Sequence, residues 1–136
     1  NEHYGNLACQ LTQRGISVVL LGGPAEAGAA TEIIEYLPES LRHNVMASTQ
    51  SSIQYSSAIL RHCDFCLGND TAVLNMAVAN DIPALGLFGS TPPLGHDPLM
   101  HALHAHNMAA ITIEAVLERL EEMRAPGFAG AIGFSA

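Results

Sequence analysis

The sequence has no tryptophan, 5% aromatic residues and 13% charged residues, whereas 49% of its residues are hydrophobic. Disorder requires low hydrophobicity and high net charge, so we expect these 136 residues to form one folded domain. Lys and Arg number five against thirteen acidic residues, a formal net charge of −8. That deficit argues against a nucleic-acid-binding surface, which needs clustered basic residues. The sequence also has no apolar run of about 18 residues, the length of a transmembrane helix.

The three cysteines, Cys9, Cys63 and Cys66, are too few for a disulfide framework and favour a reducing cytoplasm. Cys63 and Cys66 have C-x-x-C spacing, but they fall in a predicted strand rather than at the start of a helix. We therefore expect the two thiols on opposite faces of the sheet, in structural roles. The first residues show neither an initiator Met nor a signal-peptide pattern, so we expect the chain to be a piece of a larger protein.

Segments with helical spacing of apolar residues alternate with short, β-branched apolar runs. The predicted helices are 3–14, 25–37, 53–60, 71–79 and 113–123, and the predicted strands are 16–21, 45–48, 63–67, 82–88 and 99–106. This order predicts an α/β fold with a Rossmann-like, doubly wound and mostly parallel sheet. We assign residues 1–124 to this domain and leave the Gly- and Ala-rich residues 125–136 as a C-terminal tail.

Several predicted strands end in loops of small, hydrogen-bonding residues. These loops are residues 22–26, 48–52, 68–71 and 89–93. Ligands of open parallel sheets bind beyond the carboxyl ends of the strands, where these loops would meet. Three of the loops lead into a helix, and the N–H groups at a helix N-terminus suit a phosphate. Asp70 or Thr71 can equally be a plain helix cap, and both interpretations stay open.

Glu26 follows Gly22-Gly23 at the end of the first predicted strand. An acidic residue after a nucleotide-binding strand can accept both hydroxyls of a ribose. Neither G-x-G-x-x-G nor G-x-x-x-x-G-K-[ST] occurs, so we expect neither a dinucleotide fingerprint nor a P-loop.

A histidine-rich stretch follows the last of these loops and contains His96, His101, His104 and His106. It lacks the ligand spacing of a zinc site, and we expect no metal there. Because His96 comes soon after the loop at 89–93, it is a candidate for the same ligand pocket.

Four motifs follow one another in a fixed order. They read V-V-L-L-G-G-P-A-E, then S-S-I, then N-D-T-A-V-L-N-M-A-V-A, and then P-A-L-G-L-F-G-S-T-P-P. This series resembles the C-terminal domain of the bacterial heptosyltransferases, glycosyltransferase family nine. That family shows Gly-Gly-x-x-Glu, Thr-Ser-Leu, Asp-[Ser/Thr]-Gly-x-x-His-x-Ala-Ala and [Phe/Tyr]-Gly-[Pro/Ser]-Thr. The resemblance extends over residues 1–120, and the four motifs together are specific although each is weak singly.

The resemblance implies the GT-B architecture of two facing Rossmann-like domains. This half would bind the nucleotide sugar ADP-heptose, and an N-terminal half would bind the lipopolysaccharide-core acceptor. Transfer in the family inverts the anomeric centre and requires no metal or other cofactor. The catalytic carboxylate lies in the N-terminal half, so we expect no catalytic residue here and no activity of this chain alone. The implied location is cytoplasmic, with peripheral attachment to the inner face of the inner membrane through the other half.

The resemblance also implies which residues bind the nucleotide sugar. They are Gly22, Gly23, Glu26, Ser51, Ser52, Asp70, Thr71, Ala72, Val73, Leu74, Asn75, Gly89 and Thr91. Glu26 would bind the ribose, and the neighbourhood of the serine pair would line the adenosine site. Backbone N–H groups of residues 71–74 would stabilise charge that develops on the leaving diphosphate.

Two positions depart from the family pattern: Ala72 replaces the motif glycine and Asn75 replaces its histidine. Asparagine can donate a hydrogen bond to a phosphate oxygen but cannot carry the charge of an imidazolium. Two alternatives therefore stay open, a transferase of another nucleotide sugar and a degenerate, non-catalytic domain that binds a nucleotide or another phosphoryl ligand. A receiver-like or flavodoxin-like module is disfavoured, because the first strand is not followed by the acidic cluster or phosphate loop of those proteins.

Overall fold

The structure is a computed structural model and describes residues 2–50, 52–88, 99–104, 111–123 and 129–134. Its α-helices are α1 (Glu2–Gln13), α2 (Ala27–Tyr36), α3 (Ile53–Leu60), α4 (Thr71–Ala79) and α5 (Ile113–Met123). Two 3-10 helices are η1 (Pro24–Glu26) and η2 (Glu39–Asn44). The strands are β1 (Ser17–Leu21), β2 (Val45–Ser48), β3 (Phe65–Gly68), β4 (Ala84–Phe88), β5 (Met100–His104) and β6 (Ala129–Gly133).

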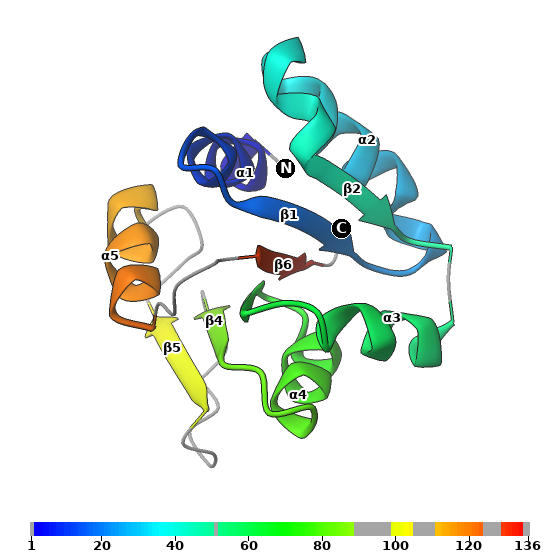
Figure 1. Cartoon of the computed structure of the whole chain (residues 1–136), viewed down its shortest axis with the longest axis vertical. Helices are drawn as coiled ribbons and strands as arrows, with labels where there is room; N and C mark the ends of the chain where they lie inside the picture. The colour runs from blue at the N-terminus through cyan, green and yellow to red at the C-terminus, as the bar shows by residue number, and fades with distance from the viewer. Residues whose placement is uncertain (1, 51, 89–98, 105–110, 124–128, 135–136) are drawn as a thin grey trace.

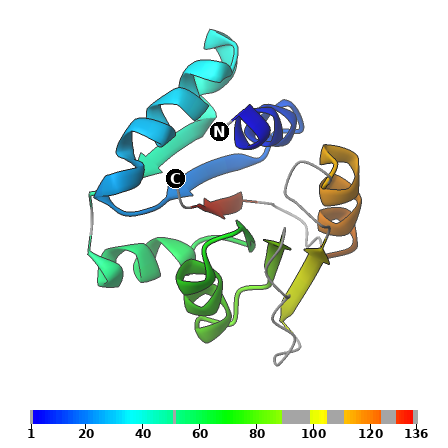
Figure 2. The ribbon, with the colours of Figure 1, turned by 180° about the vertical axis from the view of Figure 1, so that it is seen from behind.

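The strands form one six-stranded sheet of order β2-β1-β6-β3-β4-β5, in which all neighbours are parallel. Helices α1, α2 and α5 cover one face, and α3 and α4 cover the other (Figures 1 and 2). This arrangement confirms the predicted α/β fold with a parallel sheet between two layers of helices.

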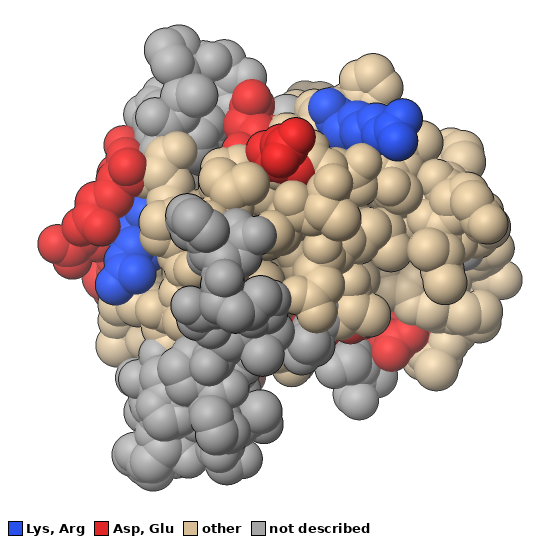
Figure 3. All heavy atoms as spheres, turned by 90° about the horizontal axis from the view of Figure 1, so that it is seen from below, with Lys and Arg blue, Asp and Glu red and all other residues tan. Residues whose placement is uncertain are grey.

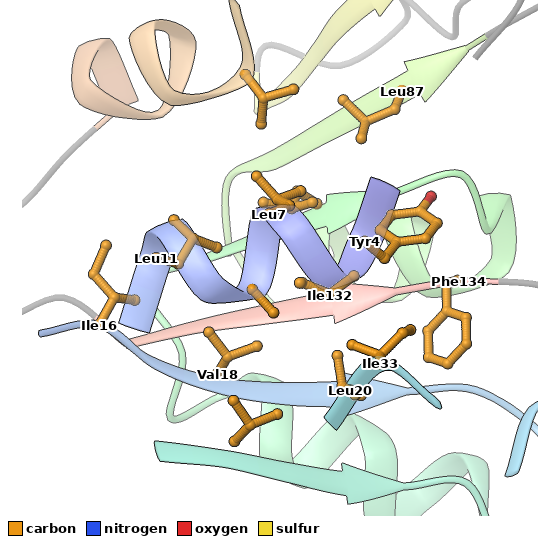
Figure 4. Close-up of a cluster of buried hydrophobic side chains, with 14 of the residues drawn as sticks. Tyr4, Leu7, Leu11, Ile16, Val18, Leu20, Ile33, Leu87, Ile132 and Phe134 are labelled. Atoms are coloured by element: carbon orange, nitrogen blue, oxygen red, sulfur yellow. The ribbon is translucent and has the colours of Figure 1, made fainter. Parts of the chain in front are cut away.

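Both faces of the central strands are buried, because alternate side chains enter separate hydrophobic clusters. In β1, Val18 and Leu20 pack in the cluster under α1 and α2, whereas Val19 and Leu21 pack under α3 and α4. Figure 4 shows the first cluster, where Leu7 and Leu11 of α1 lie over the sheet. Burial on both faces explains why the strands read as continuous apolar runs.

The middle of the sheet is occupied by β6, the last strand in sequence. It pairs with β1 on one side and β3 on the other, and its residues Ala131 and Ile132 are fully buried. A Cβ atom at Gly130 would collide with the ring of Phe65, so only glycine fits this strand against that ring. This corrects the assignment of residues 125–136 to a tail: 129–133 belong to the core of the domain, and a boundary at 124 does not separate them from it.

The remaining differences from the predicted elements are small. The segment 25–37 divides into η1 and α2, and the weak strand predicted at 45–48 is β2. The strand predicted at 63–67 begins at Phe65, so Cys63 precedes it. The strand predicted at 99–106 contains β5, and residues 105 and 106 lie outside the described residues.

Candidate functional site

The carboxyl ends of β1, β3 and β6 meet where the strand order reverses, which is the usual ligand crevice of such sheets. The N–H of Phe134, just after β6, donates to the carbonyl of Leu21 at the end of β1, at 3.1 Å. On the other side, Gly68 ends β3 with φ of +147° and lies so close to the carbonyl of Gly133 that a Cβ atom would collide with it. The loops after β1 and β3 are thus held on either side of β6.

The turn after β1 is organised by Glu26. Its Oε2 accepts a hydrogen bond of 2.7 Å from the N–H of Gly23, and its own N–H donates to the Gly23 carbonyl at 3.0 Å. The N–H of Gly22 donates to the Ser48 carbonyl at 3.3 Å, which joins this turn to the end of β2. Glu26 is half-buried, so one carboxylate oxygen serves the turn while the residue stays within reach of solvent at the crevice.

Asp70 is the N-cap of α4. Its Oδ1 accepts hydrogen bonds from the N–H groups of Ala72, at 3.0 Å, and Val73, at 3.4 Å. The N–H of Leu74 donates to the Asp70 carbonyl at 3.0 Å. The cap interpretation of Asp70 is therefore confirmed. It also modifies the expected diphosphate site, because three of the N–H groups assigned to the phosphates are engaged by Asp70 in this structure.

The side chains of the first turns of α4 divide between core and solvent. Val73 and Leu74 are buried and pack with the cluster under α3 and α4, so their side chains are not available to a ligand. Ala72 and Asn75, the two departures from the family motif, are exposed. Any change of ligand chemistry at these two positions would therefore act at the surface of the helix.

The serine loop leads into α3. Ser52 is exposed and caps this helix, accepting a hydrogen bond of 3.2 Å from the N–H of Tyr55. Beside it, at the carboxyl end of β2, is a cavity of about 190 Å³. The cavity is lined by Met46, Ala47, Ser48, Thr49, Gln50 and Tyr55. Met46 and Tyr55 are large apolar residues that stay more than half exposed, which suits contact with a flat aromatic ring.

Some predicted residues lie outside the described part of the chain. They are Ser51, Gly89, Thr91, His96 and His106. Thr71 is placed as the first residue of α4, and His101 and His104 lie in β5, at the far side of the sheet from β1. The structure therefore brings together Gly22, Gly23, Glu26 and the start of α4 around the end of β6.

Tyr4 lies at this edge of the sheet, in the first of the predicted helices, and no site was predicted there from the sequence. Its side chain is 6% exposed, and its hydroxyl has no hydrogen-bond partner among the described residues. Burial raises the pKa of Tyr4, the backbone of Asn69 opposes that change, and the Asp70 charge adds to it. A tyrosine in an apolar stripe at the start of a helix was the only available signal for this residue.

The described basic residues lie away from the crevice. Arg14 bonds to Gln10, Arg42 to the carbonyls of Glu35 and Leu37, Arg61 to Asn80, and Arg119 to Glu122 and the Ala102 carbonyl. Seen from below, the surface has few charged side chains, which form small, separate groups (Figure 3). Within the described residues, an anion at the crevice would thus depend on neutral donors and the α4 dipole.

The C-x-x-C pair is structural. Burial raises the pKa of Cys63 to about 11, with a contribution from Asp64, and burial raises the pKa of Cys66 to about 12. Both thiols pack in the cluster under α3 and α4, which corrects the expectation of opposite faces: Cys63 precedes the strand, so strand alternation does not apply to it. Across the described ranges, no three Cys, His, Asp or Glu side chains gather as a set of metal ligands.

The model of glycosyltransferase family 9 (heptosyltransferase) matches residues 1–121. The lipooligosaccharide heptosyltransferase 2 of Haemophilus influenzae is 30% identical over 98 residues, which cover 71% of this chain and 28% of that protein.

Two solved structures from E. coli have the same fold. ADP-heptose lps heptosyltransferase II aligns with a TM-score of 0.81 at 24% identity, covering 89% of this chain and 40% of that one. Heptosyltransferase WaaC with ADP-2-deoxy-2-fluoro heptose aligns with a TM-score of 0.76 at 25% identity, covering 90% of this chain and 38% of that one. The chain thus spans well under half the length of each of these proteins.

Proposed function

The chain belongs to glycosyltransferase family 9, and we propose that it is the nucleotide-sugar-binding half of a heptosyltransferase. The proposed donor is ADP-heptose, and the proposed acceptor is a lipopolysaccharide-core sugar held by another half. The observation that carries the proposal is the meeting of the Gly22–Glu26 turn and the start of α4 at the switch point of the sheet. The ADP-sugar analogue in the structure of WaaC supports this choice of donor.

The proposed arrangement of the donor follows the crevice. The adenine would occupy the cavity at the end of β2, against Met46 and Tyr55. The ribose hydroxyls would donate to the carboxylate oxygen of Glu26 that does not bond to Gly23. The diphosphate would then lie over the end of β6, beside the start of α4.

The proposed chemistry of this half is stabilisation of the leaving ADP. The positive end of the α4 dipole would oppose the charge that develops on the diphosphate as the bond to the sugar breaks. We assign no catalytic base to this chain, since family membership points to a carboxylate of the other half. No metal or other cofactor enters the proposal.

The second candidate is either a degenerate domain that binds a nucleotide or another phosphoryl ligand without transferase activity, or a transferase that uses another nucleotide sugar. It is favoured by one feature, the start of α4, where Ala72 and Asn75 replace the family's glycine and histidine and Asp70 engages the N–H groups. Binding of a nucleotide without turnover by the complete enzyme would support the non-catalytic alternative.

We propose a cytoplasmic location, with peripheral contact to the inner membrane through the acceptor-binding half. Family membership is the support for this location. In the described part of the chain, every helix is too short or too polar to cross a bilayer.

Calorimetric titration of the chain with ADP, with UDP and GDP as controls, tests the proposal. We expect selective binding of ADP. Glu26→Ala should weaken it by about 1–3 kcal/mol, because the ribose hydroxyls lose a charged acceptor. Glu35→Ala, which removes an exposed carboxylate from the outer part of α2, is the matched control and should leave the affinity unchanged.

Three results would count against the proposal in different ways. Equal binding of the three nucleotides would contradict ADP as the donor nucleotide. Unchanged ADP affinity in Glu26→Ala would place the ribose elsewhere. No binding of any nucleotide would contradict a donor site in this chain.

A further inference from the structure

Two polar atoms at the start of α1 are buried without a hydrogen-bond partner in the described structure. They are the hydroxyl of Tyr4 and Nε2 of His3. Buried polar groups are nearly always hydrogen-bonded, because leaving them unpaired loses their bonds to water. Two such atoms without a hydrogen-bond partner at one helix end therefore require an explanation.

The ring of Tyr4 is held firmly. Its centroid lies 5.9 Å from that of Phe134, which follows β6, and 6.0 Å from that of His3, which meets it edge to face. Figure 4 shows the Tyr4 oxygen at the end of the cluster away from Leu11 and Ile16, toward the carboxyl end of β6. Packing thus directs the buried hydroxyl toward the carboxyl edge of the sheet, where the loops after β1 and β3 lie.

The groups that face this hydroxyl belong to the proposed donor site. The Asn69 backbone lowers its pKa and the Asp70 carboxylate raises it, so both groups lie close to the hydroxyl. Because burial also raises that pKa, the phenol keeps its proton at neutral pH and can donate it. The hydroxyl is therefore a neutral donor beside the start of α4.

We propose that Tyr4 is a ligand-binding residue of this site, whose hydroxyl donates a hydrogen bond to a phosphoryl oxygen of the nucleotide diphosphate. This inference rests on the proposed function. It adds a neutral donor beside the start of α4, where the N–H groups of Ala72 and Val73 donate to Asp70. The described arginines bond to other parts of the chain. The unpaired hydroxyl of the ligand-free protein is then a group prepared for its ligand.

Tyr4→Phe removes the hydroxyl and keeps the ring. We expect ADP to bind about tenfold more weakly, the effect of losing a hydrogen bond to a charged group. Without ligand, the variant should be as stable as the parent chain or more stable, because an unpaired buried hydroxyl has been removed. Tyr36→Phe is the matched control: its exposed hydroxyl donates to Asn6 Oδ1 at 2.7 Å, and its loss should leave ADP affinity unchanged.

Calorimetry with ADP and thermal unfolding without ligand give the two readouts. ADP binding to Tyr4→Phe with the parent affinity would overturn the role of Tyr4 and leave the proposed function intact. A variant that is both less stable and weaker in binding would show that the hydroxyl has a structural partner, such as an ordered water, and would also overturn it. If the parent chain does not bind ADP, the proposed function and this inference fail together.

Discussion

The central position of β6 can be tested with Gly130→Ala. This substitution should destabilise the protein if β6 lies inside the sheet, and should not if these residues lie outside it. Gly130 lies in β6 against the fully buried ring of Phe65, and a Cβ atom there would sit 2.5 Å from Cε1 and 2.8 Å from Cε2 of that ring. These separations are shorter than carbon atoms tolerate. Gly130→Ala must therefore shift the ring or separate the strands.

Overpacking of this kind lowers the free energy of unfolding by about 1–3 kcal/mol. If residues 129–133 lay outside the sheet, the same substitution would be neutral or would stabilise the protein by about 0.4–1 kcal/mol, because alanine restricts the unfolded chain. Gly28→Ala is the control for that second effect. Gly28 is an exposed residue of α2, and a Cβ atom added there would meet no other atom within 4 Å. We therefore expect Gly28→Ala to stabilise the helix by about 0.5–1 kcal/mol.

Phe65→Leu provides the second arm, since leucine lacks the Cε and Cζ atoms that a Cβ at Gly130 would meet. Alone it should lower stability by about 1–2 kcal/mol through lost apolar burial. Combined with Gly130→Ala, it should relieve the collision. The double variant should therefore lose less stability than the sum of the two single-variant losses, by at least about 0.5 kcal/mol. Urea unfolding measures all four proteins. Additive losses, or a neutral Gly130→Ala, would refute the packing of β6 against Phe65.

Three further predictions concern the crevice and the core. Asp70→Ala should lower the free energy of unfolding by about 1 kcal/mol through loss of the α4 cap, and Asp70→Asn, which can still accept, should lose less in urea titrations. Iodoacetamide at pH 8 should modify the half-exposed Cys9 before Cys63 and Cys66, because burial raises the pKa values of these two thiols to about 11 and 12. A mass-spectrometric time course measures the order, and early modification of Cys66 would contradict its burial. The folded pKa of Tyr4 lies above the unfolded value of about 10, so the folded state favours the protonated phenol. The free energy of unfolding should therefore fall as the pH rises above about 10, and this Tyr4-dependent fall should be absent in Tyr4→Phe.

The alternation of helices and strands was predictable because each element has its own periodicity. Apolar runs such as Val18–Leu21 indicate strands that are buried on both faces, and spacing such as that of Leu7 and Leu11 indicates a helix. The turn at Gly22–Glu26 and the cap at Asp70 were also predictable, because both depend on residues close in sequence.

The position of β6 was not predictable by the same reasoning. Ala129–Gly133 has one large apolar residue, Ile132, and two glycines, which are depleted in strands because they add no packing surface. Here their small size is what the sheet requires. The ring of Phe65 fills the space beside Gly130, and the side chain of Val73 fills the space beside Gly133. Tertiary packing thus selects a sequence that local preference disfavours. The unpaired hydroxyl of Tyr4 likewise follows from contacts between the two ends of the chain.

The start of α4 permits two arrangements of a bound diphosphate, and they differ in the role of Asp70. In the first, the phosphates take the N–H groups of Ala72 and Val73, so Asp70 must rotate away and competes with the ligand. In the second, Asp70 stays in place as the cap, and the phosphates lie on the β6 side, within reach of the α4 dipole. The unpaired Tyr4 hydroxyl favours the second, because it supplies a donor outside the cap. The second arrangement also keeps α4 capped in both states, so binding need not oppose the stability of the helix.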